Sequence, residues 1–154
     1  MSARSILAAA IGVAAVACSG GDSMTGPSGS ATSYAGEWSG TTSQGTPLTV
    51  MVSPDQRVTS ITVGYRFNGC SGSKTFTDLS LPIAVVQPPP GNPVPPGPFN
   101  NNPGFGYGSG SPEASDFTQV YGAFTSGATA TGSIVFGSYA GCGNGTALWT
   151  ASKR

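Results

Sequence analysis

Residues 58–69 read VTSITVGYRFNG, and this stretch holds the clearest strand pattern in the chain. Residues at alternate positions suit a buried face, while Arg66 falls on the opposite face, where it meets solvent. This period of two predicts a half-buried β-strand. Its core face is expected to hold Thr59, Ile61, Val63, Tyr65 and Phe67. Asn68-Gly69 is typical of a tight hairpin, so the chain is expected to turn back there.

The same alternation recurs in short segments on both sides of this hairpin. It runs through residues 34–42, 48–53, 74–79, 81–86, 117–124, 131–139 and 146–152. Turn residues separate these segments and none has helical periodicity, which predicts about eight strands in an all-β antiparallel meander. Trp38 near the start and Trp149 near the end suggest that the first and last strands meet. That favours a small closed or nearly closed barrel without exposed edges, with a two-sheet β-sandwich as the alternative.

The first 17 residues predict export. Arg4 supplies a positive charge, and residues 6–17 form an apolar run that is shorter than the roughly 20 residues of a membrane-spanning helix. The run ends in Ala15-Val16-Ala17-Cys18, which resembles the lipobox of bacterial lipoproteins, with Ala15 where Leu is usual. This resemblance implies cleavage before Cys18 and a diacylglyceryl group on its sulfur. The alternative is an ordinary secretory peptide that is cleaved after the Ala-x-Ala pattern.

These features divide the chain into a signal peptide at 1–17, a flexible tether at 18–33 and a single β domain at 34–154. The lipobox resemblance implies that a lipid holds the protein at a membrane of the cell envelope, on the periplasmic side or at the cell surface. Ser19 follows the cysteine where Asp would indicate retention in the inner membrane, so inner and outer membrane both stay open.

Composition limits the partners of the β domain. Charged residues make up only 8% of the chain and the formal net charge is 0, so no basic face for nucleic acid is expected. Cys70 and Cys142 remain beyond the lipobox, and an even pair in an exported protein predicts a disulfide. Two free buried thiols are the alternative.

Residues 87–114 interrupt the strand pattern. They contain most of the chain's prolines and an Asn triplet at 100–102. Proline cannot donate to a β ladder, so this segment is expected to form an exposed loop of polyproline and coil character. Phe99, Phe105 and Tyr107 are its adhesive residues, which makes residues 87–110 a candidate contact for a protein partner. The alternative is an insertion without function.

The inventory of reactive side chains is small. The chain has no histidine, which removes Ser-His-Asp and Cys-His arrangements and most zinc sites. We therefore predict no catalytic residue, no metal, no cofactor and no enzymatic activity. The rival hypothesis is a carbohydrate-active hydrolase that uses Glu37 beside a second carboxylate.

Two resemblances bear on fold and function. Gly36-x-Trp38 resembles the opening motif of the calycin barrels, the lipocalins and avidins, which implies a barrel but no particular ligand residues. The interior of such a barrel could hold a small apolar ligand, or its side chains could simply fill the core. The side chains concerned are Trp38, Tyr65, Phe67, Phe136 and Trp149.

The second resemblance covers more of the chain. Residues 34–45, 63–65, 68–72, 122–126 and 148–153 resemble a small domain of bacterial exported proteins and lipoproteins without assigned function. It implies a β domain with a paired cysteine and no assigned chemistry. The sequence thus predicts a lipid-anchored envelope protein that acts as a non-enzymatic binding or structural module.

Overall fold

The structure, a computed structural model, describes residues 32–86, 101–110, 116–137 and 141–154. Predicted features at residues 1–31, 87–100, 111–115 and 138–140 lie outside the described residues. Within the described ranges the chain forms ten β-strands and no α-helix. The strands are β1 (Gly36–Thr42), β2 (Pro47–Val52), β3 (Arg57–Phe67), β4 (Cys70–Phe76), β5 (Leu81–Pro82), β6 (Ala84–Val85), β7 (Pro103–Ser109), β8 (Phe117–Phe124), β9 (Thr129–Gly137) and β10 (Gly145–Lys153).

All strand pairs are antiparallel and belong to one curled sheet. Its order is β4-β3-β2-β1-β10-β9-β8-β7-β6, and β5 pairs with β3. The sheet therefore consists of two hairpin meanders, β1–β4 and β7–β10, that are joined by the pairing of the first strand with the last. This pairing places Trp38 opposite Lys153 and Thr42 opposite Trp149. The predicted antiparallel meander is confirmed, and so is the meeting of the chain's first and last strands.

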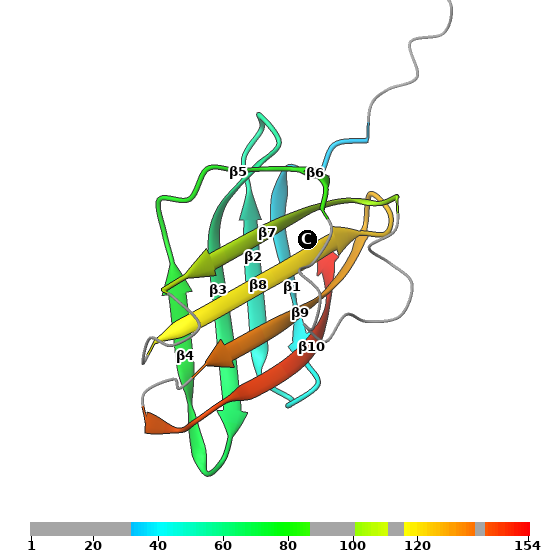
Figure 1. The fold of residues 1–154 in the computed structure, drawn as a ribbon. Helices are drawn as coiled ribbons and strands as arrows, with labels where there is room; N and C mark the ends of the chain where they lie inside the picture. The colour runs from blue at the N-terminus through cyan, green and yellow to red at the C-terminus, as the bar shows by residue number, and fades with distance from the viewer. Residues whose placement is uncertain (1–31, 87–100, 111–115, 138–140) are drawn as a thin grey trace, which may run out of the picture. The chain divides into compact units, whose positions relative to one another are not determined.

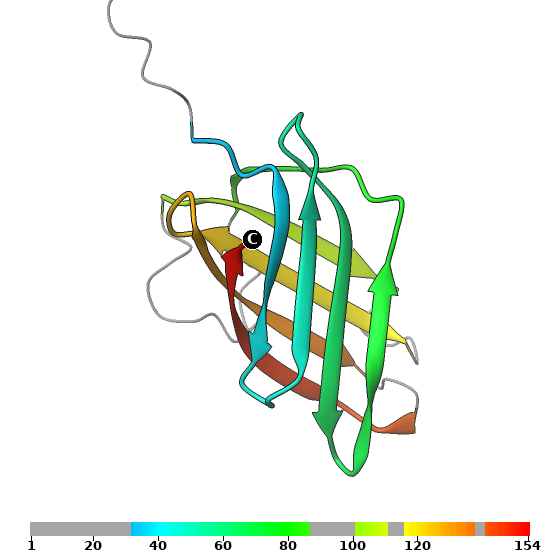
Figure 2. The same cartoon turned by 180° about the vertical axis from the view of Figure 1, so that it is seen from behind.

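The curl brings the two meanders face to face. Figures 1 and 2, seen from opposite sides, show β7–β10 crossing obliquely over β1–β4. Within the described residues β4 pairs only with β3, so hydrogen bonds do not close the barrel between β4 and β7. Side chains bridge this side instead, because the rings of Phe76 and Tyr107 lie 4.8 Å apart and Lys74 Nζ donates to Asp116 O at 3.2 Å. The fold is a barrel-like sheet with one side closed by packing.

A β-bulge corrects the predicted faces of the longest strand. Met51 pairs with Ser60, but Val52 pairs with Val58, so Thr59 is the additional residue. The bulge shifts the alternation by one position, and Val58 becomes fully buried on the core face. The prediction was correct for Ile61 and Val63, which are fully buried, and wrong for Thr59. Asn68 and Gly69 adopt positive φ, as the predicted hairpin requires.

The predicted loop at 87–114 was wrong for residues 103–109, which form β7. Phe105 pairs with Gly122, and Tyr107 pairs with Val120 in the ladder to β8. Phe105 is 1% exposed and Tyr107 packs against the core cluster, so these two rings serve the interior rather than a partner. Glycines between them hid the strand pattern. At Gly106 an added Cβ would lie 3.0 Å from the Tyr121 ring across the ladder, a close approach that the ring would have to relieve by a small shift.

Other glycines also make room for aromatic rings on the neighbouring strand. An added Cβ on Gly122 would lie 2.5 Å from the Phe105 ring and 2.8 Å from the Trp149 ring. Gly132, the ladder partner of both Gly122 and Trp149, lies under the same indole. The high glycine content is therefore explained in part by packing, since large rings fill the volume that absent side chains leave.

Candidate functional site

Of the five aromatic residues proposed as ligand-facing, Trp38, Phe136 and Trp149 are buried in the core, Tyr65 and Phe67 pack against it partly buried, and all five contact other rings. Tyr65, Phe67 and Phe136 form a cluster with ring centroids 5.3–5.6 Å apart. Trp38 meets Phe124 edge-on at 4.8 Å and is fully buried. These contacts are those of side chains that fill a core, and they favour that alternative over ligand contact.

The two indoles differ in how their N–H groups are satisfied. Trp38 Nε1 donates to the Tyr34 carbonyl at 2.8 Å. Trp149 is stacked on Phe105 at 6.3 Å and is 2% exposed, but its Nε1 has no hydrogen-bond partner among the described residues. A buried donor without a partner lowers the free energy of unfolding. The packing of the indole ring, rather than a hydrogen bond, therefore stabilises Trp149 in the core.

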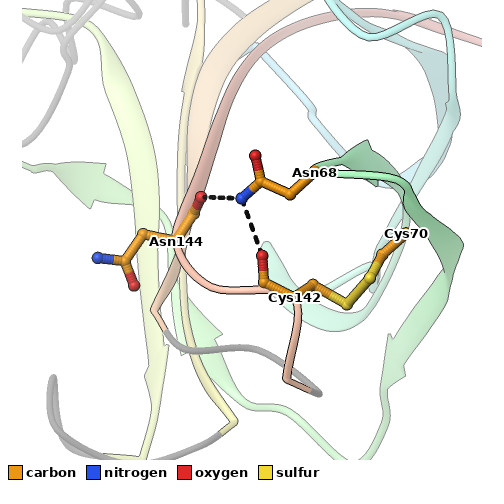
Figure 3. Close-up of a disulfide and its surroundings, with 4 residues drawn as sticks. All are labelled: Asn68, Cys70, Cys142 and Asn144. Carbon is orange, nitrogen blue, oxygen red and sulfur yellow. Dashed lines mark hydrogen bonds between the residues drawn. A yellow bond between two sulfur atoms is a disulfide. The ribbon is translucent and has the colours of Figure 1, made fainter.

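The predicted disulfide between Cys70 and Cys142 is present, with the two Cα atoms 6.0 Å apart. It joins the start of β4 to the segment that leads into β10. The side-chain amide of Asn68 reinforces the same junction, because Nδ2 donates to the carbonyls of Cys142 at 2.8 Å and of Asn144 at 3.3 Å (Figure 3). The β3–β4 hairpin is thus fastened to the opposite meander by a covalent bond and two hydrogen bonds. This geometry is structural, and the paired sulfurs are not nucleophiles.

Cys18, the predicted lipidation site, lies outside the described residues, as does Phe99 of the predicted partner loop. Glu37, the carboxylate considered for hydrolysis, lies on the sheet face turned away from the core. There its Oε1 is 3.3 Å from Nη1 of Arg154. Asp55 lies in a turn, where the Ser53 hydroxyl and its own backbone N–H hold the pKa of the carboxyl below its ordinary value. Among the described residues no three His, Cys, Asp or Glu side chains gather as metal ligands would.

A cavity of about 350 Å³ lies on the face of β1, β9 and β10 that is turned away from the core. Residues on this outer face alternate with the buried ones: Thr41 and Thr150 are exposed ladder partners, and Thr131 pairs with Thr150 on the other side. The lining comprises Ser39, Gly40, Thr41, Thr125, Thr129, Ala130, Thr131, Thr150, Ala151 and Ser152. We call these ten residues the hydroxyl groove. None of them carries an ionisable side chain.

Three hydroxyls of the groove are unengaged. Thr41, Thr150 and Ser152 are exposed, and their hydroxyls have no protein partner among the described residues. Others are held in place: Thr131 Oγ1 donates to the Trp149 carbonyl at 3.0 Å, and Ser39 Oγ accepts from Arg154 Nε at 2.7 Å. Each hydroxyl can donate one hydrogen bond and accept two. The engaged hydroxyls therefore offer a ligand acceptors in fixed positions, and the three unengaged hydroxyls offer donors as well.

A second cavity of about 250 Å³ continues the groove toward the β1–β2 turn. It shares Thr41, Thr131 and Thr150 with the hydroxyl groove and is also lined by Thr42, Ser43, Leu148 and Trp149. Leu148 is 40% exposed and provides an apolar surface at this end. The outer face thus carries an elongated, uncharged depression with hydroxyls along its length and one apolar contact.

Sequence reasoning missed this site, although a signal for it was present. Ser or Thr occupies alternate positions in residues 39–41, 129–131 and 150–152, on the face opposite the buried residues of each strand. Such residues are common on solvated strands, and only the ladder register shows that the three segments are neighbours.

Among the described residues, no helix has the length and apolar character that crossing a bilayer requires. Comparisons of the chain with protein-family models, curated proteins and solved structures find no match.

Proposed function

We propose that the mature protein is an exported, non-enzymatic binding module, that a lipid on Cys18 holds it at a membrane of the cell envelope, and that it binds a neutral, hydroxyl-rich ligand in the hydroxyl groove. The observation that carries this proposal is the groove itself, whose uncharged lining includes three hydroxyls without a partner in the part of the chain that the structure describes. A ligand of the same chemistry, a saccharide, satisfies such groups through reciprocal hydrogen bonds.

Charge supports a neutral ligand. Binding an anion calls for a cation free to pair with it. Among the described residues, Arg154 contacts the groove lining through Ser39, and its guanidinium already pairs with the Glu37 carboxylate at 3.3 Å. The ligand class is therefore one recognised by hydrogen bonds and apolar contact.

Two observations support the cellular part of the proposal. The segment from Arg4 to Cys18 has the charge, length and final cysteine of a lipoprotein leader. The Cys70–Cys142 disulfide suits an oxidising compartment outside the cytoplasm.

The binding site is tested with Thr150→Val, which removes a hydroxyl while keeping the shape and strand propensity of the residue. Thr146→Val is the matched control, because Thr146 is exposed on the same strand and lines neither cavity. Neutral oligosaccharides are titrated into the mature, disulfide-bonded chain and followed by NMR. We expect Thr150→Val to weaken binding about three- to tenfold and Thr146→Val to leave it unchanged. Equal binding by the two variants refutes the site.

The anchor is tested separately with Cys18→Ala in the full chain. We expect the variant to remain unprocessed or to leave the membrane fraction, because acyl chains contribute about 0.8 kcal/mol per buried methylene. A variant that matures normally and stays with membranes contradicts the lipid anchor. That result has no bearing on the proposal that the groove binds a ligand.

A further inference from the structure

One edge of the sheet keeps backbone hydrogen-bonding groups free. Within the described residues β4 pairs with β3 alone, so its other side is an end of the sheet (Figure 2). The two-residue turn at Asn68-Gly69 makes Phe67 and Cys70 a hydrogen-bonded pair, and such pairs then alternate with non-bonded ones along the ladder. Every second residue of β4 therefore directs its N–H and C=O groups away from β3. These residues are Ser71, Ser73 and Thr75.

This edge lacks the features that usually protect a strand from further pairing. Its three outward-directed residues are exposed, and their backbone groups on this side have no partner in the described part of the chain. Proline, a bulge or an outward charge commonly blocks such an edge. β4 has no proline, and its ladder with β3 runs without a register shift. Lys74 is turned toward its own chain, because Nζ donates to Asp116 O at 3.2 Å and lies 5.2 Å from the centre of the Phe76 ring.

The backbone pattern of this edge is complementary to a second copy of itself. If two β4 strands run antiparallel about a two-fold axis at Ser73, each Ser73 meets the other and Ser71 meets Thr75 of the second copy. All three pairs then consist of residues whose N–H and C=O groups face the partner strand. A hydrogen-bonded antiparallel pair exchanges two bonds, so the three pairs would form about six.

Side chains and charge agree with this register. On one face hydroxyls of Ser and Thr lie opposite each other, and on the other face Gly72 lies opposite Lys74, so no like charges meet directly. The formal net charge of the chain is 0, which removes long-range repulsion between copies. Because an unrelated peptide would have to supply this match by chance, the second copy is the occupant that the sequence of the edge favours.

We propose that β4 is the interface through which two copies of the chain join edge to edge, as a two-fold symmetric dimer with a sheet that continues from one copy into the other. At the other end of the sheet β6 has only two residues and offers no comparable edge. No residue of β4 lines either cavity, so this inference goes beyond the proposed function and does not depend on it. The contact is narrow and polar, so we expect a weak dimer with a dissociation constant of about 0.1 mM.

Sedimentation velocity of the mature, disulfide-bonded protein at low salt measures the association. As the concentration rises to about 1 mM, the average mass should approach twice that of one chain. Ser73→Lys should weaken association about three- to fivefold, because two lysines would then lie directly opposite each other. Ser71→Lys is the matched control, since it adds the same charge to the same exposed edge but places it opposite Thr75. It should leave association unchanged.

A mixing experiment tests the two-fold axis itself. Ser73→Glu should associate as weakly as Ser73→Lys, whereas an equal mixture of the two should associate at least as tightly as the wild-type chain, because opposite charges then face each other. Ser73→Pro removes the outward N–H and leaves the ladder with β3 intact, so it should weaken association about tenfold or more. A urea midpoint like that of the wild-type chain would show that this variant is folded.

Three results would overturn the interface. The first is a protein that stays monomeric up to about 1 mM. The second is an equal effect of Ser73→Lys and Ser71→Lys, or a mixture of the Lys and Glu variants that does not restore association, since either result places the contact in another register or on another surface. The third is a folded Ser73→Pro variant that associates as tightly as the wild-type chain. If Ser73→Pro is not folded, the charge variants decide, because their exposed side chains leave the backbone unchanged.

Discussion

Replacing Gly122 with Ala tests whether the glycines of the sheet are required for packing. The added Cβ would lie 2.5 Å from Phe105 and 2.8 Å from Trp149, closer than side-chain carbons approach one another. Both rings are at most 2% exposed, so neither can swing into solvent. Overpacking of this kind costs about 1–3 kcal/mol, against a gain of about 0.5–1 kcal/mol for replacing glycine within a strand. We therefore expect a net loss of up to about 2.5 kcal/mol, toward the upper end because the added Cβ meets two buried rings.

Gly108→Ala is the matched control, because Gly108 lies in the adjacent strand β7 and its added Cβ would meet only Gln119 Cγ at 3.7 Å. That distance is an ordinary contact, so this variant should be neutral or more stable by about 0.5 kcal/mol. Urea unfolding of the disulfide-intact proteins measures the free energy of unfolding of both variants, provided that their m-values agree. If Gly122→Ala is as stable as Gly108→Ala, the packing argument is wrong.

A second change tests the cause of the loss. Phe105→Leu removes ring atoms that meet the new methyl group, so it should cost less in the Gly122→Ala background than in the wild-type chain. The difference between the two costs is the interaction energy of the pair, expected at about 1 kcal/mol. Additive costs would show that Gly122→Ala acts through something other than the ring.

Three further outcomes are expected. Replacing both Cys70 and Cys142 with Ser should lower the free energy of unfolding by about 4 kcal/mol, since the bridge closes a loop with a sequence separation of 72; urea unfolding measures this loss. Asn68→Gly keeps the left-handed turn but removes both amide hydrogen bonds, so it should cost about 1–2 kcal/mol in the same assay, and an unchanged midpoint would contradict the fastening role. Burial raises the pKa of Tyr121 above its ordinary 10.0, so the stability it contributes is present below pH 10 and lost as pH rises through the folded pKa; urea midpoints should fall above pH 10, and less so in Tyr121→Phe.

Most of the fold followed from alternation along the chain. In β2 and β10 each buried residue falls where the pattern placed it, because these strands bury one face and expose the other. Alternation could not predict the bulge at Thr59, because no particular residue type marks where an additional residue enters a strand. The strand β7 was missed because three glycines interrupt its alternation; the Tyr121 ring of β8 that covers Gly106 is visible only once the strands are paired.

The candidate site was missed for a related reason. Its hydroxyls come from residues 39–41, 125–131 and 150–152, far apart in sequence, and they become one surface only because β10 pairs with both β1 and β9. Alternation predicts which residues face outward, but the sequence does not state the register between distant strands.

The low charge of the chain has a structural counterpart on this outer face. An exposed sheet commonly carries charged side chains, which keep it soluble and discourage association. Here hydroxyls occupy the corresponding ladder positions from Thr75 to Thr129. Substituting Lys for Thr41 should not unfold the domain, because Thr41 is exposed on the outer face and the core stays intact. If the groove served only as a solvated surface, this change would also leave binding of neutral saccharides intact, whereas a ligand in the groove would be displaced by the bulk of the lysine side chain.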